Sequence, residues 1–353
     1  MYNDFYKGKK VFITGHTGFK GSWLCEILTL LGAKVCGYSL EAPTNPNLYK
    51  LLNLDEKIIS VIGDIRDYDK LLDTMTDFEP DIVIHMAAQP IVRTSYKRPR
   101  YTYDVNVMGT VNVMEAIRHN PSVKSVVNVT TDKVYLNREW NYGYRECDEL
   151  CGYDPYSNSK SCSELVTYSY KKSFFDGVEF PRVSTCRSGN VIGGGDFAKD
   201  RIMTDSISSY LNKEDIIIRN PYSIRPYQHV MDALNGYLTV AYMQYEDKKY
   251  ASEYNFGPQD ENCITTGNLV NLFVEKTGNK IKWCDKSDGG PHEANFLKLD
   301  ISKATSVLNW HPVWNIDKTM DMIVEWLNAY ENKKNITDVV DKQIMNFFRD
   351  KGE

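Results

Sequence analysis

No run of apolar residues in this 353-residue sequence approaches the roughly 20 that a membrane-spanning helix needs. The first four residues, Met1 to Asp4, are polar, and no apolar core of a signal peptide follows them. Hydrophobic residues make up 42% of the chain and charged residues 25%, which is typical of globular proteins. We therefore expect an ordinary soluble protein that works in the cytoplasm.

The sequence also lacks the patterns that hold metals or nucleic acids. Its eight cysteines are scattered, and the closest pair, Cys147 and Cys151, has neither the spacing of a zinc site nor a second pair nearby. Its six histidines form no H-E-x-x-H motif, so we predict reduced cysteines and no metal site. The net charge of −5 argues against a nucleic-acid surface, so a phosphate group would need a local cluster of arginines and lysines.

The first half of the chain contains a regular alternation of strand-like and helix-like segments. This order predicts an α/β fold with a doubly wound parallel sheet of the Rossmann type. The expected strands are 11–13, 34–39, 57–62, 81–85 and 124–131, and the expected helices are 22–31, 67–78 and 101–119. Ligands of such sheets bind beyond the carboxyl ends of the strands, which places four residues on one rim: Gly15, Asp64, Ala87 and Thr131.

Residues 11–21 read V-F-I-T-G-H-T-G-F-K-G, an uncharged strand followed by glycine at every third position: Gly15, Gly18 and Gly21. This spacing allows a tight turn, close approach of the backbone to a pyrophosphate, and close packing of the helix on its strand. Unpaired N–H groups at the start of the helix then face the phosphates. Glycines also serve ordinary turns, but the order of strand, helix and strand around this motif favours a dinucleotide site.

Beyond Gly177 the alternation becomes irregular, and glycine and proline become more frequent. We predict a dinucleotide-binding domain at 1–178 and a smaller mixed α/β substrate domain at 179–330, interleaved with the end of the first. The charged segment 331–353 is expected to form a helical tail.

Two groups of residues have the chemistry of proton transfer. Tyr156 and Lys160 lie four apart at the start of an expected helix, hence on one face, and an ammonium group there would lower the phenol pKa from its usual value of about 10. A solvated surface pair is the alternative. Thr131, Asp132 and Lys133 follow the fifth strand and supply a hydroxyl, a carboxyl and an amine, which suit an elimination. Alternatively, Asp132 caps the next segment and Lys133 is solvated.

The glycine turn, Thr131 and the Tyr156/Lys160 pair together resemble the extended short-chain dehydrogenase/reductase family. The T-D-K triplet resembles the nucleotide-sugar 4,6-dehydratases within it. Further segments are similar to the members that act on CDP-glucose, namely 132–135, 137–140, 143–146, 152–157, 225–230, 299–300 and 303–304.

This resemblance implies a lyase that converts CDP-glucose to CDP-4-keto-6-deoxyglucose and water, with NAD bound throughout, as a step toward deoxysugars such as those of O-antigen lipopolysaccharide. Tyr156 would take the proton of the 4-hydroxyl group, with Thr131 bonded to the same oxygen, while hydride passes from C4 to NAD. Asp132 would protonate the departing 6-hydroxyl group, and hydride would return to C6. Lys133 stands where dTDP-glucose enzymes have a glutamate base, so it either removes the C5 proton or orients Asp132 or the substrate.

The resemblance also implies the binding residues. For NAD these are Gly15, His16, Gly18, Phe19, Lys20, Gly21, Asp64, Ile65, Ala87, Ala88, Tyr156 and Lys160, among which His16 and Lys20 would contact a phosphate or the adenosine ribose. For the nucleotide sugar they are Gln89, Asn190, Arg201, Arg219, Arg225 and His292. Ser39 ends the second expected strand, where an acidic residue usually binds the ribose of NAD, so the choice between NAD and NADP stays open here. A homodimer built from the helices that follow Tyr101 and Tyr156 is also implied.

Three alternatives remain at this point. The first is a 4,6-dehydratase of another nucleotide sugar, and the second is a nucleotide-sugar 4-epimerase. The epimerase needs no acid to expel a hydroxyl group, so Asp132 discriminates against it. The third is a cofactor-binding sensor on the same fold, against which the intact Thr131, Tyr156 and Lys160 argue.

Overall fold

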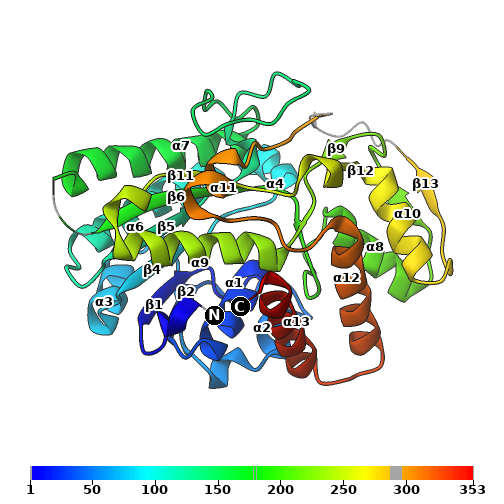
Figure 1. The fold of residues 1–353 in the computed structure, drawn as a ribbon, viewed down its shortest axis with the longest axis horizontal. Coiled ribbons are helices and arrows are strands. Elements are labelled where there is room, and N and C mark those ends of the chain that lie inside the picture. Colours follow the sequence, from blue (N-terminus) through cyan, green and yellow to red (C-terminus); the bar gives the residue numbers. More distant parts are fainter. Residues whose placement is uncertain (1, 178, 180, 287–295, 353) are drawn as a thin grey trace.

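A seven-stranded parallel sheet forms the centre of the computed structural model, which describes residues 2–177, 179, 181–286 and 296–352 (Figure 1). The strand order is β11-β6-β5-β4-β1-β2-β3, and every neighbouring pair is parallel. The strands are β1 (Lys10–Thr14), β2 (Lys34–Ser39), β3 (Ile59–Ile62), β4 (Ile82–His85), β5 (Ser125–Val129), β6 (Arg182–Ser188) and β11 (Glu253–Phe256). The predicted doubly wound, Rossmann-type fold is therefore confirmed.

Helices cover both faces of the sheet, and the alternation of side chains along β1 shows why. Val11 and Ile13 point into one core and Phe12 into the other, and all three are fully buried. The first core is closed by α1 (Phe19–Leu30), α9 (Val230–Glu246) and α13 (Ile336–Lys351). The second is closed by α3 (Tyr68–Phe78) and α6 (Gly109–Arg118), with α7 (Pro155–Tyr170) packed beside α6.

The helix expected at 101–119 is three segments instead of one. It consists of α5 (Pro99–Tyr103), a π-helical turn at Asp104–Met108, and α6. The buried Asn106 of this turn accepts a hydrogen bond from the Gln89 N–H and donates one to the Ser159 hydroxyl. The side-chain amide of Asn106 in this π-helical turn thus links the loop that follows β4 to α7.

The second half of the chain builds a smaller unit around its own apolar core. Its helices are α8 (Ile202–Asn212), α10 (Thr266–Lys276) and α12 (Ile316–Glu331). Its strand pairs are β7 (Val191–Ile192) with β10 (Gln228–His229), β9 (Ile224–Arg225) with β12 (Ile264–Thr265), and β8 (Ile216–Ile218) with β13 (Trp283–Asp285). The remaining described α-helices are short: α2 (Leu48–Leu51) and α4 (Val92–Lys97) in the first half of the chain, and α11 (Ser302–Leu308) in the second. The predicted division at 178 and 330 stays a prediction, and α9 and β11 return from the later part of the chain to the sheet.

The two ends of the chain lie close together beside α1 and α13 (Figure 1). Lys351 Nζ lies 5.1 Å from the centre of the Tyr2 ring. Among the described helices, none combines the length and the apolar character needed to cross a bilayer.

Candidate active site

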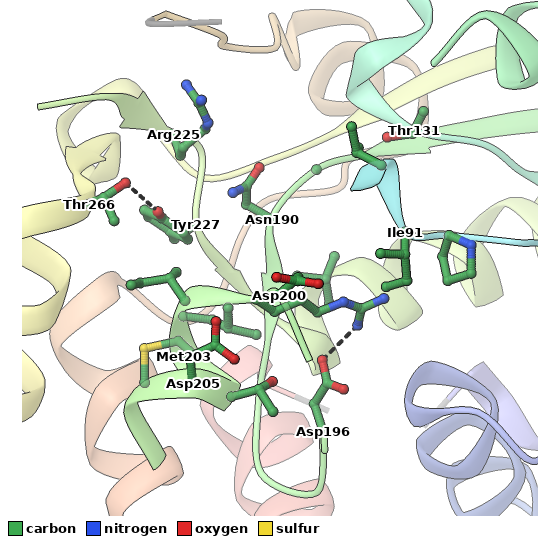
Figure 2. A pocket seen from close by; sticks show the side chains of 18 of the residues that line it. Ile91, Thr131, Asn190, Asp196, Asp200, Met203, Asp205, Arg225, Tyr227 and Thr266 are labelled. Carbon is green, nitrogen blue, oxygen red and sulfur yellow. Dashed lines mark hydrogen bonds and ion pairs between the residues drawn. The ribbon is translucent and has the colours of Figure 1, made fainter. Parts of the chain in front are cut away.

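A cavity of about 330 Å³ lies beyond the carboxyl ends of β5 and β6 (Figure 2). Residues 130–133 after β5 and residues 188–193, which begin at the end of β6, line it on the side of the sheet. The loop before α8, the start of α8 and residues 217–220, which begin within β8, line it on the side of the smaller unit. This is the position at which open parallel sheets bind ligands.

Tyr156 and Thr131 are brought together in this cavity. Asp154 caps α7 by accepting hydrogen bonds from the N–H groups of Tyr156 and Ser157, and this fixes the first turn of the helix. Thr131 contributes to the pKa of the Tyr156 phenol, so the two side chains are neighbours. Thr131 Oγ1 donates to Asp132 Oδ1 at 3.0 Å. Three of the predicted catalytic side chains therefore lie together on the wall of the cavity.

The expectation that the Tyr156 phenol has a lowered pKa is wrong for this structure. Burial raises its pKa to about 12, and the neighbouring Thr131 side chain only partly offsets that rise. Lys160 Nζ lies farther down the helix, where it donates to the carbonyl oxygen of Val129 at 3.1 Å. Burial, together with the nearby charge of Lys20, lowers the pKa of Lys160 to about 7, and Glu164 offsets part of this shift. Desolvation is thus the largest cause of both pKa shifts.

A buried ion pair, which the sequence analysis missed, joins α7 to β6. Glu164 follows Tyr156 and Lys160 on the same face of α7 and forms a two-point ion pair with Arg187 of β6, at 2.8 and 2.9 Å. It also accepts hydrogen bonds from the hydroxyl groups of Thr130 and Thr185. The spacing of eight residues from Tyr156 was the only signal for it in the sequence.

Asp132 is the most deeply buried acid of the cavity, with 1% of its surface exposed. Burial raises the pKa of its carboxyl group, although Lys133, Thr131 and Arg225 lower it in part. Among the described residues, none forms a hydrogen bond with Asp132 Oδ2. The carboxyl group is therefore suited to hold a proton and donate it, as a general acid must. Lys133 is partly buried on the wall of the same cavity.

The glycine turn has the shape expected of a dinucleotide site. Gly15 has a φ of +83°, and a Cβ on Gly21 would overlap the carbonyl oxygen of Gly15. At Gly18 the nearest atom to such a Cβ is the same oxygen at 3.4 Å, so the space beside this residue is open. No side chain caps the start of α1, where Gly18 is the N-cap residue, so its first N–H groups can meet a phosphate.

His16 does not have the predicted role. Its ring is completely buried, and both nitrogens are occupied, one by the Ser60 hydroxyl at 2.7 Å and the other by the Ser39 hydroxyl at 3.0 Å. Burial lowers its pKa to about 4. The imidazole therefore connects the glycine turn to Ser39 at the end of β2 and to Ser60 near the start of β3, and neither ring nitrogen is free for a phosphate or a ribose.

The other predicted dinucleotide residues occupy two places. Phe19 and Lys20 line the cavity, and burial lowers the pKa of Lys20 to about 8. Asp64, Ile65, Ala87 and Ala88 follow β3 and β4. The Asp64 carboxylate is held by Arg66 at 2.6 Å, which lowers its pKa, and the side chain of Ile65 is buried in the core. Ala87 N donates to Thr14 Oγ1 at 3.1 Å and lies directly against Gly15.

Of the predicted substrate residues, Asn190, Arg201, Arg219 and Arg225 line the cavity. Gln89 does not: its buried amide donates to Thr102 Oγ1 at 2.9 Å and accepts from Ile91 N at 2.7 Å, so the prediction that it binds substrate is wrong. His292 lies outside the described residues.

The sequence analysis missed four charged residues of the cavity: Arg93, Asp196, Asp200 and Asp205. Arg201 pairs with Asp196 at 2.6 Å, and Arg219 pairs with Asp200 at 3.1 Å and with Asp205 at 3.5 Å. The alternation of acidic and basic residues between 196 and 205, just after three glycines, was the signal that could have revealed them.

Comparison with known proteins decides the family. Residues 12–323 match the family described as GDP-mannose 4,6 dehydratase. The chain belongs to this family. It is 49% identical over 332 residues to the CDP-glucose 4,6-dehydratase of Salmonella typhimurium, covering 93% of this chain and 92% of that protein. It is 30% identical to the GDP-mannose 4,6-dehydratase of Vibrio cholerae, covering 91% of this chain and 94% of that protein. The predicted membership of the nucleotide-sugar 4,6-dehydratases is confirmed, and the chain is an enzyme of that class.

Solved structures of similar fold agree with this architecture. The UDP-glucose 4-epimerase of Thermotoga maritima, solved with UDP-glucose, has a TM-score of 0.79 at 19% identity, covering 92% of this chain and 99% of its own. The dTDP-glucose 4,6-dehydratase of Bacillus anthracis, solved with NAD, has a TM-score of 0.75 at 20% identity, covering 93% of this chain and 99% of its own.

Proposed function

We propose that this enzyme converts CDP-glucose to CDP-4-keto-6-deoxyglucose and water with NAD as its cofactor. The nucleotide is supported by the 49% identity to a CDP-glucose 4,6-dehydratase, and the reaction is supported by the cavity itself. Asp132 is the single feature that carries the reaction type. A buried acid with one unbonded oxygen stands beside Thr131 and Tyr156, and an epimerase would have no use for it.

The glycine turn is suited to hold NAD. The uncapped start of α1 and the open space at Gly18 suit a pyrophosphate, and Asp64 can accept a hydrogen bond from an adenine amino group. When bound there, NAD supplies a reversible acceptor for the hydride that leaves C4 and returns to C6. Ser39 is tied to His16 and Thr17 and brings no positive charge, so nothing on β2 favours the extra phosphate of NADP.

The side chains of the cavity divide the remaining work. Tyr156 and Thr131 share the 4-hydroxyl oxygen. Tyr156 takes the hydroxyl proton as a phenolate, which forms once neighbouring cations lower the phenol pKa from about 12. The protonated Asp132 donates through Oδ2 to the departing 6-hydroxyl group. Lys133 borders the same space, either as the base that takes the C5 proton or as the group that orients Asp132.

Two arginines account for the diphosphate. Arg201 and Arg225 come from two separate segments and line one cavity, and guanidinium groups can bind phosphate oxygens at two points. Asp196 holds Arg201 in place before a substrate arrives.

We also propose a homodimer that pairs α7 and the α5–α6 region of two chains. Leu165 and Tyr168 lie on one face of α7 and are 55% and 58% exposed, and Met108 between α5 and α6 is 50% exposed. A four-helix arrangement would cover this apolar face.

The cytoplasmic location and the place in deoxysugar biosynthesis stay predictions.

Mass spectrometry tests the substrate directly. With CDP-glucose and a catalytic amount of NAD, the product should be lighter by one water molecule. The same assay with the glucose derivatives of UDP, dTDP and GDP should show far slower turnover. Rapid dehydration of one of these and no change in CDP-glucose would contradict the proposed substrate.

A further inference from the structure

The side chain that would recognise cytosine is not assigned by the family likeness, and the cavity offers one. This inference rests on the proposed function, which names a cytidine nucleotide. Cytosine presents an amino donor at C4 beside an unprotonated N3, whereas uracil and thymine present a carbonyl oxygen and an N–H at the same places. A site that selects cytosine therefore needs an acceptor beside a donor.

Asp205 and Arg219 form such a pair. Asp205 lies in the first turn of α8, and Arg219 follows β8, which packs against α8. Arg219 Nη2 is 3.5 Å from Asp205 Oδ2, and the two side chains are 32% and 35% exposed on the cavity wall. A carboxylate beside a guanidinium group offers an acceptor next to donors, which complements the edge of cytosine.

The position of Asp205 in the cavity agrees with this role. In Figure 2, Asp205 and Met203 lie on the opposite side of the cavity from Thr131, with Asn190 between them. The hexose must reach Thr131 and Tyr156 for the reaction, so the nucleotide extends toward α8. Met203, Ile207 and Tyr227 line the cavity there and provide apolar surface for a flat base.

The other acids of the cavity are less suited. Asp132 stands at the reacting end. Asp196 is held by Arg201 at 2.6 Å and accepts from Ala198 N, so its oxygens are occupied. Asp200 belongs to the loop before α8, whereas Asp205 is fixed on a helix, which holds a binding group more accurately.

We propose that Asp205 accepts a hydrogen bond from the cytosine amino group while Arg219 donates to the neighbouring ring acceptor. Uracil and thymine would place a carbonyl oxygen against the carboxylate, and this repulsion would exclude them. The competing explanation is that Asp205 only orients Arg219. That explanation predicts equal losses for every nucleotide.

The test measures binding of CDP and UDP by calorimetry, together with kcat/KM for CDP-glucose and UDP-glucose. Asp205→Asn can turn its amide to present either an oxygen or an NH2 group. It should therefore lower the preference for cytidine over uridine by about tenfold to a hundredfold. Asp200→Asn is the matched control, since Asp200 also lines the cavity and pairs with Arg219. It should change CDP and UDP binding by the same factor and leave their ratio as in the wild type.

The outcomes separate this inference from the proposed function. A wild-type preference for CDP that Asp205→Asn leaves unaltered, or equal losses for CDP and UDP, would overturn the role of Asp205 alone. A wild-type enzyme that binds CDP and UDP equally would overturn the proposed substrate and this role with it. Retained UDP binding by the variant shows that it is folded.

Discussion

Gly189 lies directly against the side chain of Asp132, since a Cβ on this glycine would overlap Oδ2 of Asp132. The glycine follows β6 and the aspartate follows β5, so two neighbouring strand ends enclose one carboxyl group. This enclosure removes water from Oδ2 and favours the neutral acid, which is the form that can protonate a leaving hydroxyl group.

Asp132→Asn tests the role of this acid. The amide keeps the shape of the side chain but cannot transfer an acidic proton. Dehydration should therefore fall by about a hundredfold to ten-thousandfold, while oxidation at C4 continues in a single turnover and reduced nicotinamide accumulates. Stopped-flow absorbance follows both steps. Asp196→Asn, in the same cavity, should not accumulate reduced nicotinamide. An equal loss of both steps in Asp132→Asn would show that Asp132 is not the acid.

Two glycines of the turn should respond differently to alanine. Gly21→Ala forces its Cβ into the Gly15 carbonyl, so the free protein should melt at a clearly lower temperature. Gly18→Ala fits the free protein, so its free energy of unfolding should stay within about 0.5 kcal/mol of the wild-type value. Its methyl group, however, blocks the position of the phosphate. Differential scanning calorimetry with and without NAD should show that Gly18→Ala loses the stabilisation by NAD. Full stabilisation of Gly18→Ala would place the pyrophosphate elsewhere.

Glu164→Gln should leave Arg187 buried without a counter-charge. The expected loss in the free energy of unfolding is about 3–5 kcal/mol. The double variant Glu164→Gln/Arg187→Met removes the unpaired charge and should regain much of this loss. Urea denaturation measures both. A double variant that is less stable than the single one would mean that the charge of Arg187 is not the cause.

Asp232 of α9 should make stability depend on pH. It is fully buried, accepts a hydrogen bond from Val313 N at 2.6 Å, and burial raises its pKa from 3.8 to about 7. The folded state therefore keeps a proton that the unfolded state releases, so stability should fall as pH rises from about 4 to 7 and then level off.

Asp232→Asn removes this titration. The loss of unfolding free energy between pH 5 and pH 8 should shrink by about 2–4 kcal/mol relative to the wild type. The burial of Glu26 also raises its pKa to about 7, so the comparison must be made between the two proteins at each pH. Parallel pH profiles for variant and wild type would contradict a raised pKa at Asp232.

The proposed dimer can be tested by placing a charge on α7. Leu165→Glu should convert a dimer into a monomer, as measured by light scattering of the purified protein. Val307→Glu is the control, because Val307 is 40% exposed on α11, which packs on β11 and α9. A wild-type monomer, or a dimer that Leu165→Glu does not alter, would exclude this interface.

Local sequence patterns predicted five of the seven strands of the sheet, and four of these, β1, β3, β4 and β5, are rich in β-branched residues. The expected strand 34–39 coincides with β2, and the helix expected at 67–78 is α3 with Asp67 as its cap. The helix at 101–119 was predicted as one piece, because nothing local shows that Asn106 bonds to Gln89 and Ser159.

The candidate site was predicted where a motif alone fixes geometry, as at Gly15, Gly21 and Thr131. His16 and Gln89 were assigned wrongly because their partners, Ser60 and Thr102, are distant in sequence or lie outside any motif. The predicted direction of the Tyr156 pKa shift was wrong because burial, which a sequence does not show, raises this pKa.

The most direct measurement uses CDP-glucose that carries deuterium at C4, incubated with the enzyme and catalytic NAD in ordinary water. The product should be lighter by one water molecule and carry the deuterium on the C6 methyl group, visible by NMR. Deuterium that returns to C4 of an undehydrated sugar, or that is lost to solvent, would contradict the proposed reaction.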